Sequence, residues 1–387
     1  NSLKPSVLHV VPYYPPDRIG GVGEVARVIH EGLVDRGFRS RVLTSGRTIV
    51  DSRVRRIGRG PGQFAVLSWL GVRHARRYDI LHVHHGEALL LLLLLRLLRN
   101  RPRVLLMLHV DLRRLAASER PHSVDGRRFA DSGIVRVWRE VKRFVRGLLD
   151  RFALRCCDEV VVESSVLVSE LRDLIGARRV HVVPNALSDR SRLPGHSIPH
   201  VELLYVGTPG MRKRTHLLPM ILQRVRDEVP DARLRVVGFE ESDDPRLERE
   251  VKRLGLAEAM IFEGRQRAEE VQAFYSAADV LVLPSAYEGM PMTLREGMLA
   301  GLPVVATNVS GHPDAVVDGV NGFLVPLDDP TALAERCVEV LMDPEARSSM
   351  GAAAAATVRG RFLVERQLED LVSIYRGLDP EPIPGCR

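Results

Sequence analysis

Two glutamates, Glu288 and Glu296, flank the start of a predicted helix within the segment 284–307. The aliphatic run 280–283 predicts a buried strand that stops at a Pro-Ser pair, so Glu288 falls in the following loop. Pro291 suits the first position of the helix, which places Glu296 about one turn inside it. Both carboxylates therefore lie beside the free backbone N–H groups of one helix N-terminus.

A helix start of this kind binds phosphate through its own N–H groups and dipole. Carboxylates would repel that phosphate, but they accept hydrogen bonds from vicinal hydroxyls, so one glutamate could hold a ribose and the other a sugar. A nucleotide-diphosphate sugar carries all three groups. Taken alone, the same spacing also fits a solvated loop glutamate and a charge that stabilises the helix.

The order of a strand, the sequence Glu-Gly-Met-Pro at 288–291, a helix bearing Glu296 and then Ala-Gly-Leu-Pro-Val-Val-Ala at 300–306 resembles the donor-site signature of family 4 retaining glycosyltransferases. The resemblance extends over most of the chain. It implies a GT-B fold, in which two doubly wound, Rossmann-like α/β domains face each other across a cleft. It also implies transfer of a glycosyl group from a nucleotide-diphosphate sugar to an acceptor hydroxyl with retention of configuration.

The resemblance assigns roles to the residues of this signature. Glu288 would hold the sugar as a catalytic residue, and Glu296 would hold the ribose. The other donor-binding positions implied are Gly289, Met290, Pro291, Met292 and Thr293. Because the sequence contains no D-x-D metal motif and the helix dipole with Lys213 can stabilise the leaving diphosphate, no metal or other cofactor is expected.

The first half of the chain contributes a glycine turn and a histidine. The turn 20–23 opens a predicted helix and lets backbone N–H groups approach a phosphate. In the family this turn faces the donor diphosphate, so the resemblance implies that Gly20 and Gly21 bind the diphosphate. His109 ends a predicted strand, as a family histidine near the donor sugar does, and is the expected catalytic partner of Glu288. Further candidates near it are Asp111, His82, His84 and His85.

Arg212 and Lys213 follow the first strand of the second half and could neutralise a diphosphate, or form an ordinary solvated basic turn. The family places an Arg directly after the strand glycine and a Lys five residues later. Lys213 matches that lysine, whereas Thr208 stands at the arginine position, so Arg212 is expected to compensate. Arg265 and Gln266 match the family turn that touches the nucleobase.

The 387 residues, 45% of them hydrophobic, suffice for two domains. Strands alternate with helices in both halves, and a Ser/Pro/Gly-rich linker covers 188–200. We therefore expect an N-terminal, acceptor-side domain over 1–195, a nucleotide-sugar-binding domain over 196–363, and a last helix with tail over 364–387 that crosses back to the first domain. The leucine-rich run 89–98 is too short for a membrane span and predicts a core helix, and 53–62 predicts a basic loop.

Positive charge is concentrated in the first half. Residues 1–199 carry 35 Lys+Arg and 19 Asp+Glu, a net charge of +16, against −9 for residues 200–387. This asymmetry favours an anionic or lipid-linked acceptor, or else a solvated arginine-rich face. The basic amphipathic run 134–157 fits either peripheral contact with an anionic membrane or packing within the fold. No RNA-binding motif is present, so nucleic acid is not an expected partner.

Four cysteines without metal-ligand spacing fit a reducing cytoplasm, and no signal peptide is visible, so we expect a cytoplasmic protein, free or peripheral at the inner membrane face. Two other classes remain open. A nucleotide-sugar epimerase can share the two-domain architecture and would need no acceptor. A non-catalytic basic membrane-binding protein would explain the charge of the first half, but it would leave Glu288 and Glu296 without a function.

Overall fold

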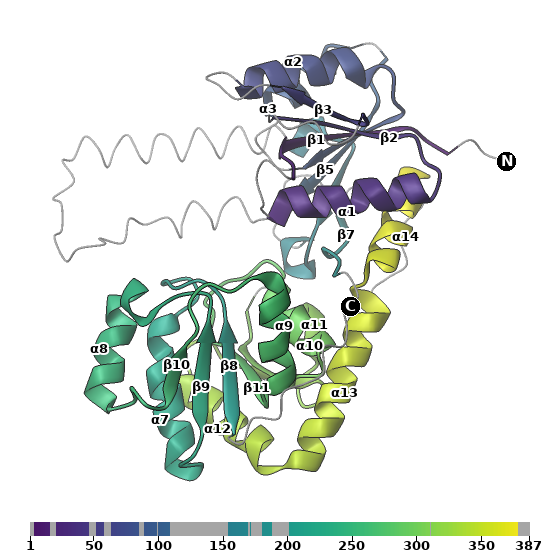
Figure 1. Ribbon diagram of the computed structural model, residues 1–387. Helices are drawn as coiled ribbons and strands as arrows, with labels where there is room; N and C mark the ends of the chain where they lie inside the picture. Colours follow the sequence, from purple (N-terminus) through teal and green to yellow (C-terminus); the bar gives the residue numbers. More distant parts are fainter. Residues whose placement is uncertain are drawn as a thin grey trace, which may run out of the picture. The chain divides into compact units, whose positions relative to one another are not determined.

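A computed structural model describes residues 4–15, 21–45, 52–57, 63–84, 89–98, 100–108, 154–168, 171, 180–187, 201–309 and 311–377. The chain divides into two compact units (Figure 1). Unit 1 comprises Asn1–Asn185 with Gln367–Pro382, and unit 2 comprises Ala186–Arg366 with Ile383–Arg387. The chain thus leaves unit 1 after Asn185 and returns to it at Gln367. The expected linker 188–200 lies outside the described residues.

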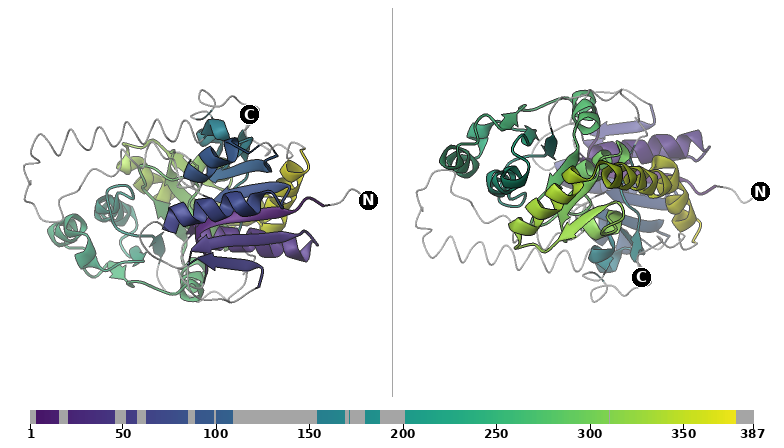
Figure 2. Two further views of the ribbon diagram at one scale, coloured as in Figure 1. Left: turned by 90° about the horizontal axis from the view of Figure 1, so that it is seen from above. Right: turned by 90° about the horizontal axis from the view of Figure 1, so that it is seen from below.

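Unit 1 contains a seven-stranded parallel sheet of order β3-β2-β1-β4-β5-β6-β7. Its strands are β1 (Val7–Tyr13), β2 (Ser40–Ser45), β3 (Val54–Ile57), β4 (Ile80–His84), β5 (Arg103–Leu108), β6 (Glu159–Val162) and β7 (Val180–Val182). It contains the helices α1 (Gly21–Asp35), α2 (Gln63–Ala75) and α3 (Leu89–Arg96), and α14 (Val364–Tyr375) from Gln367 onward. Seen from above in Figure 2, left, α2 crosses in front of these strands.

The edge strand β3 corrects one sequence expectation. Residues 53–62 were expected to form a basic loop, but Val54–Ile57 pairs in parallel with β2, with Val54 opposite Val42. Val54 is buried and anchors the strand to the core. Two adjacent arginines at 55 and 56 break the apolar pattern, and an edge strand tolerates them because one side of it has no neighbour.

The leucine-rich helix α3 is a core helix, as predicted. Leu91, Leu92 and Leu95 are fully buried in the unit 1 core. A Cβ at Gly71 of α2 would lie 2.9 Å from Leu91 Cδ1, so a glycine is needed for the two helices to pack this closely. Within the described part of the chain, no helix combines the length and apolar character needed to span a bilayer.

Unit 2 contains a six-stranded parallel sheet of order β10-β9-β8-β11-β12-β13. Its strands are β8 (Glu202–Val206), β9 (Arg233–Val237), β10 (Met260–Phe262), β11 (Val280–Leu283), β12 (Val304–Thr307) and β13 (Gly322–Val325). Its helices are α7 (Leu218–Glu228), α8 (Pro245–Leu254), α9 (Ala268–Ala277), α10 (Met292–Leu299), α11 (His312–Ala315), α12 (Pro330–Met342) and α13 (Pro344–Arg361), with short 3-10 turns at Thr215–Leu217 and Glu241–Asp243.

Two layers of helices cover the unit 2 sheet. One apolar cluster joins α7, α8 and α12 to one face of the strands, and a second joins α9, α10 and α13 to the other face (Figure 1). The strands are buried on both faces, which explains their continuous aliphatic sequences, such as Val280–Leu283 and Val304–Thr307.

Both sheets contain a point at which the strand order reverses. It lies between β1 and β4 in unit 1 and between β8 and β11 in unit 2. Ligands of open α/β sheets bind outside the carboxyl ends of the strands at such a switch point. The loops that follow β8 and β11 are therefore the first place to look for a binding site in unit 2.

Candidate functional site

Three loops meet at the carboxyl ends of β8, β11 and β12. The Ala286 N–H donates to the Arg212 carbonyl at 2.8 Å, which joins the first two loops. The Gly311 N–H donates to the Glu288 carbonyl at 3.3 Å, which adds the third. A Cβ at Gly311 would overlap the Gly289 carbonyl, so only glycine permits this close approach. The backbone thus holds the side chains of these loops in one place.

Glu288 is the centre of the charged cluster formed there. Its Oε2 accepts a hydrogen bond from Arg212 Nη1 at 2.8 Å. Its Oε1 is ion-paired with the Lys213 ammonium and accepts a hydrogen bond from Ser285 Oγ at 3.1 Å. The structure therefore brings together the predicted sugar-binding glutamate and both predicted phosphate-binding cations, which we call the Glu288 cluster (Glu288, Arg212, Lys213 and Ser285).

The electrostatics keep Glu288 ionised. Burial alone would raise the pKa of its carboxyl group, but the charge of Lys213 and then that of Arg212 outweigh burial and hold the pKa below its ordinary value. Two cations then share one anion, so the cluster keeps a net positive charge. The Lys213 and Glu288 side chains are only 11% and 7% exposed, whereas Arg212 is 42% exposed and can reach a ligand in solvent.

Glu296 occupies the position predicted for it, about one turn inside α10. Its Oε2 accepts a hydrogen bond from the Tyr275 hydroxyl of α9 at 3.1 Å. Burial first, and the nearby Glu296 charge second, raise the pKa of Tyr275, so the phenol stays protonated and donates. Gly297 follows, and a Cβ there would lie 2.7 Å from Leu281 Cδ2, so this glycine allows α10 to pack against β11.

The start of α10 differs from the prediction by one residue. The helix begins at Met292, and Pro291 precedes it as the capping residue with φ −65° and ψ 132°. No side chain caps this N-terminus among the described contacts, and Thr293 Oγ1 is buried without a hydrogen-bond partner there. Met290 and Pro291 are buried, Gly289 is half-buried and Met292 is 41% exposed. The uncapped N–H groups suit an anion.

His312 belongs to this site but was not singled out from the sequence. It is fully buried, and its Nδ1 contacts the Thr307 carbonyl at 2.7 Å. Its Nε2 makes no hydrogen bond within the described part of the chain. Burial lowers the pKa of His312, so the ring is neutral, while the nearby Glu288 charge opposes that shift. The available signal is that His312 lies in the segment that follows a predicted strand, at the carboxyl end where ligands of α/β sheets bind.

Other predicted residues lie apart from the cluster. Arg265 is exposed after β10, and the side-chain amide of Gln266 donates to the Glu263 carbonyl. Neither makes a described contact with Glu288. The Arg214 guanidinium donates to the Leu327 carbonyl, away from its two basic neighbours.

In unit 1, Gly21 is the first residue of α1, so the glycine turn does open a helix. Gly20 and His109 lie outside the described residues, as do Asp111, His85 and almost all of the basic run 134–157. His82 and His84 occupy β4 and are both fully buried.

Two family models match the chain in succession. The model described as Glycosyltransferase Family 4 matches residues 19–190, and the model described as Glycosyl transferases group 1 matches residues 199–357. The boundary between the two matches falls near the passage from unit 1 to unit 2.

Known proteins resemble the chain to different extents. The D-inositol 3-phosphate glycosyltransferase of Corynebacterium urealyticum is 32% identical over 187 residues, which are 47% of this chain and 44% of that protein. The chain thus matches less than half the length of that relative. The N-acetyl-alpha-D-glucosaminyl L-malate synthase of Bacillus anthracis is 23% identical over 389 residues, which are 92% of this chain and 94% of that protein. The structure of Anabaena HepE in complex with UDP and glucose is 20% identical with a TM-score of 0.72, covering 97% and 100% of the two chains.

Two Rossmann-like parallel sheets and this likeness in fold show that the chain has the GT-B fold, as the sequence predicted. The two family models together span most of the chain, and the protein belongs to glycosyltransferase family 4.

Proposed function

We propose that the protein transfers a glycosyl group from a nucleotide-diphosphate sugar to an acceptor hydroxyl, with retention of configuration and without a metal ion. The observation that carries this proposal is the Glu288 cluster, in which Arg212 and Lys213 are fixed beside the uncapped N-terminus of α10. Negative charge grows on the diphosphate as the glycosyl bond breaks. Fixed cations and helix N–H groups stabilise that charge most in the transition state.

In this proposal, each of the two glutamates accepts hydrogen bonds from a different part of the donor. Glu296, held by the Tyr275 hydroxyl, accepts hydrogen bonds from the ribose. A carboxylate offers about four acceptor positions, and in Glu288 three of them receive Arg212, Lys213 and Ser285. The remaining position suits one sugar hydroxyl. The UDP in the HepE structure supports a nucleoside diphosphate as the carrier of the sugar.

The remaining donor contacts come from residues whose roles rest on the family resemblance. Arg265 and Gln266 would face the nucleobase. Gly20 and Gly21 would face the diphosphate, and His109 would contact the donor sugar as the second catalytic residue. The diphosphate needs no bound metal in this proposal, since Arg212, Lys213 and the α10 amides supply the positive charge.

We assign the acceptor to unit 1 and expect it to be anionic or lipid-linked. The basic first half supports this assignment, and so do two exposed apolar side chains of unit 1. Trp69 is 56% exposed, Leu97 is 81% exposed, and the Arg73 guanidinium lies 5.6 Å from the centre of the Trp69 ring. Exposed aromatic and aliphatic side chains beside arginine suit contact with anionic headgroups. A cytoplasmic enzyme at the inner membrane face fits this surface.

Ligand protection of the folded chain tests the donor site. A nucleoside diphosphate that binds the native state raises the unfolding temperature by mass action, so a panel of nucleoside diphosphates should show which base is preferred. Lys213→Met should abolish the shift, because it removes the buried cation of the cluster. Arg214→Ala is the matched control, since that arginine points to the Leu327 carbonyl and should leave the shift intact.

The reaction itself is tested with the preferred donor. Sugar transfer should depend on an added hydroxyl acceptor and keep the anomeric configuration. Conversion of the donor sugar to its epimer without acceptor would overturn the proposal. So would protection that survives Lys213→Met but is lost in Arg214→Ala.

A further inference from the structure

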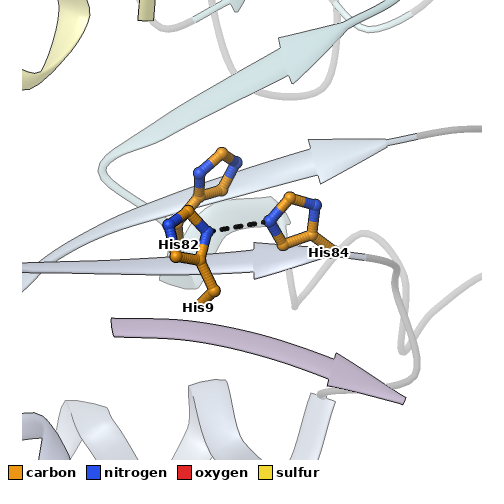
Figure 3. Close-up of side chains that lie close together, drawn as sticks. All are labelled: His9, His82 and His84. Atoms are coloured by element: carbon orange, nitrogen blue, oxygen red, sulfur yellow. Dashed lines mark hydrogen bonds between the residues drawn. The ribbon is translucent and has the colours of Figure 1, made fainter. Parts of the chain in front are cut away.

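Three buried histidines of unit 1 gather on two adjacent strands. His9 of β1 pairs in register with His82 of β4. His84 lies two residues further along β4, and alternate residues of a strand share one face. One ring nitrogen of each histidine lies within 4.8 Å of one from each of the other two (Figure 3). No part of the proposed glycosyl transfer uses this cluster.

The distances between the ring nitrogens approach those found between histidine ligands that share one metal ion. His9 Nδ1 and His84 Nε2 are 3.1 Å apart, and the stacked His82 and His84 rings have centroids 4.2 Å apart. Tetrahedral zinc, with Zn–N bonds of about 2.0–2.1 Å, holds its ligand nitrogens about 3.3–3.4 Å from one another. Small rotations of the His9 and His84 rings toward His82 would complete such a set.

Burial is the condition under which an imidazole stays neutral, and the neutral ring is the form that binds metals. All three side chains are fully buried. A neutral imidazole keeps one lone pair for a metal. His9 Nε2 makes no hydrogen bond to the described residues. In the His9 tautomer that carries its proton on Nε2, Nδ1 can therefore coordinate without breaking a bond at Nε2.

An outer partner orients one of the rings. His82 Nδ1 lies 2.7 Å from the hydroxyl oxygen of Tyr375 in α14, and Tyr375 is itself buried. Histidines that bind metals donate their second ring N–H to such a partner, which fixes the tautomer and the direction of the ring. With Nδ1 held in this way, His82 would coordinate a metal through Nε2.

We propose that His9, His82 and His84 bind one first-row transition-metal ion of the Zn²⁺ type, with water or hydroxide in the fourth position. Imidazole nitrogens suit zinc, copper, nickel and iron, whereas magnesium and calcium require oxygen ligands. A hydroxide would offset part of the charge that three neutral ligands leave uncompensated in a buried site. The ion would join β1 to β4 and, through Tyr375, to α14, so its effect is on the stability of unit 1.

The test uses the full chain without a polyhistidine tag. Elemental analysis of the purified protein, followed by long incubation with Co²⁺ because the site is buried, should give about one ion per chain. Tetrahedral Co²⁺ shows strong visible d–d bands, and loading should raise the unfolding temperature. His9→Gln and His84→Gln should each lose the bound ion, the bands and the temperature shift.

His30→Gln is the matched control. His30 is also a buried histidine of unit 1, with its ring centre 6.1 Å from that of His9 and its Nδ1 bonded to Ser40 Oγ. This variant should keep the bound ion. Equal metal content in wild type, His9→Gln and His84→Gln would overturn the proposal and leave a hydrogen-bonded histidine cluster. If those variants fail to fold, X-ray absorption of loaded wild type decides the matter: imidazole scattering supports the site, and its absence refutes it.

Discussion

Unit 2 and unit 1 each gather polar side chains near the switch point of a parallel sheet, but they do so in opposite ways. The Glu288 cluster is charged, lies on loops beyond the strand ends and keeps one partly exposed arginine. The histidine cluster of His9, His82 and His84 contains no carboxylate, arginine or lysine, lies on the strands themselves and is fully buried.

Burial explains the difference. A buried charge needs a partner of opposite sign and suffers a large penalty without one, whereas a neutral imidazole can enter the core with one or two hydrogen bonds. Charged groups that must meet a ligand in solvent are therefore placed on loops. Neutral groups buried on strands can only bind a ligand that is small enough to enter the core, such as a metal ion. The comparison predicts that the two clusters respond differently to mutation, pH and chelators.

The largest effect should follow removal of the anion from the Glu288 cluster. Glu288→Ala leaves the Lys213 ammonium buried without its partner, while Arg212 can turn to solvent. Loss of one partner of a buried ion pair costs about 3–5 kcal/mol, and we expect a value of about 3 kcal/mol, since half of the cluster can rehydrate. Urea denaturation measures it, and transfer activity should be lost with it.

Leu97→Ala, at an exposed position of unit 1, is the control for that measurement and should change stability little. A fully stable Glu288→Ala protein would show that the cluster is not the buried ion pair described above.

The second effect is on binding rather than stability. Glu296→Ala removes an acceptor of charged hydrogen bonds to the ribose, each worth about 1.5–3 kcal/mol, so the nucleoside diphosphate should bind about 10 to 100-fold more weakly. Calorimetric titration gives the affinity. Tyr275→Phe removes only the supporting hydroxyl and should have a smaller effect in the same direction. Unchanged affinity in a folded Glu296→Ala variant would remove Glu296 from the donor site.

The Glu288 cluster should also make stability depend on pH. Its partners hold the pKa of Glu288 below the ordinary value of 4.5 in the folded state. The carboxylate therefore contributes its full stability above pH 4.5, and the contribution is lost as the pH falls through the folded pKa. The difference in unfolding free energy between wild type and Glu288→Gln, measured by urea denaturation over this range, should shrink toward acid. A difference that does not change with pH would contradict the paired carboxylate.

The sequence predicted where Glu288 and Glu296 lie relative to β11 and α10, because the signals for their placement are local. Glu288, Pro291 and Glu296 fall within nine residues, where turn and helix patterns decide their placement. Arg212 and Lys213 come directly after a strand of the same sheet, and parallel strands bring such segments to one edge. The prediction missed the Pro291 boundary by one residue, since caps and first helical residues have similar sequences.

The unit 1 cluster could not be found in this way. Alternate residues of a strand point to the same face, so the sequence places His82 and His84 on one face of β4. The position of His9 relative to them depends on the register of β1 against β4. That register joins residues more than seventy apart in sequence and is set by the packing of the whole sheet. Similarly, β3 is recognised only from its pairing with β2, because Arg55 and Arg56 hide its pattern.

The smallest expected effect is also the one that best separates the two clusters. Exhaustive chelation should strip a metal ion from the histidine cluster and lower the unfolding temperature, yet leave the turnover of the proposed transferase unchanged well below that temperature. The reason is that Arg212, Lys213 and the α10 amides carry the positive charge at the diphosphate. Turnover and thermal unfolding are measured on one sample before and after chelation, with His9→Gln as the control that has no ion to lose.

Loss of turnover that magnesium or manganese restores would place a metal at the diphosphate and refute the metal-free mechanism. A loss of turnover that only zinc restores, and that His9→Gln does not show, would instead mean that the metal ion of the histidine cluster contributes to catalysis.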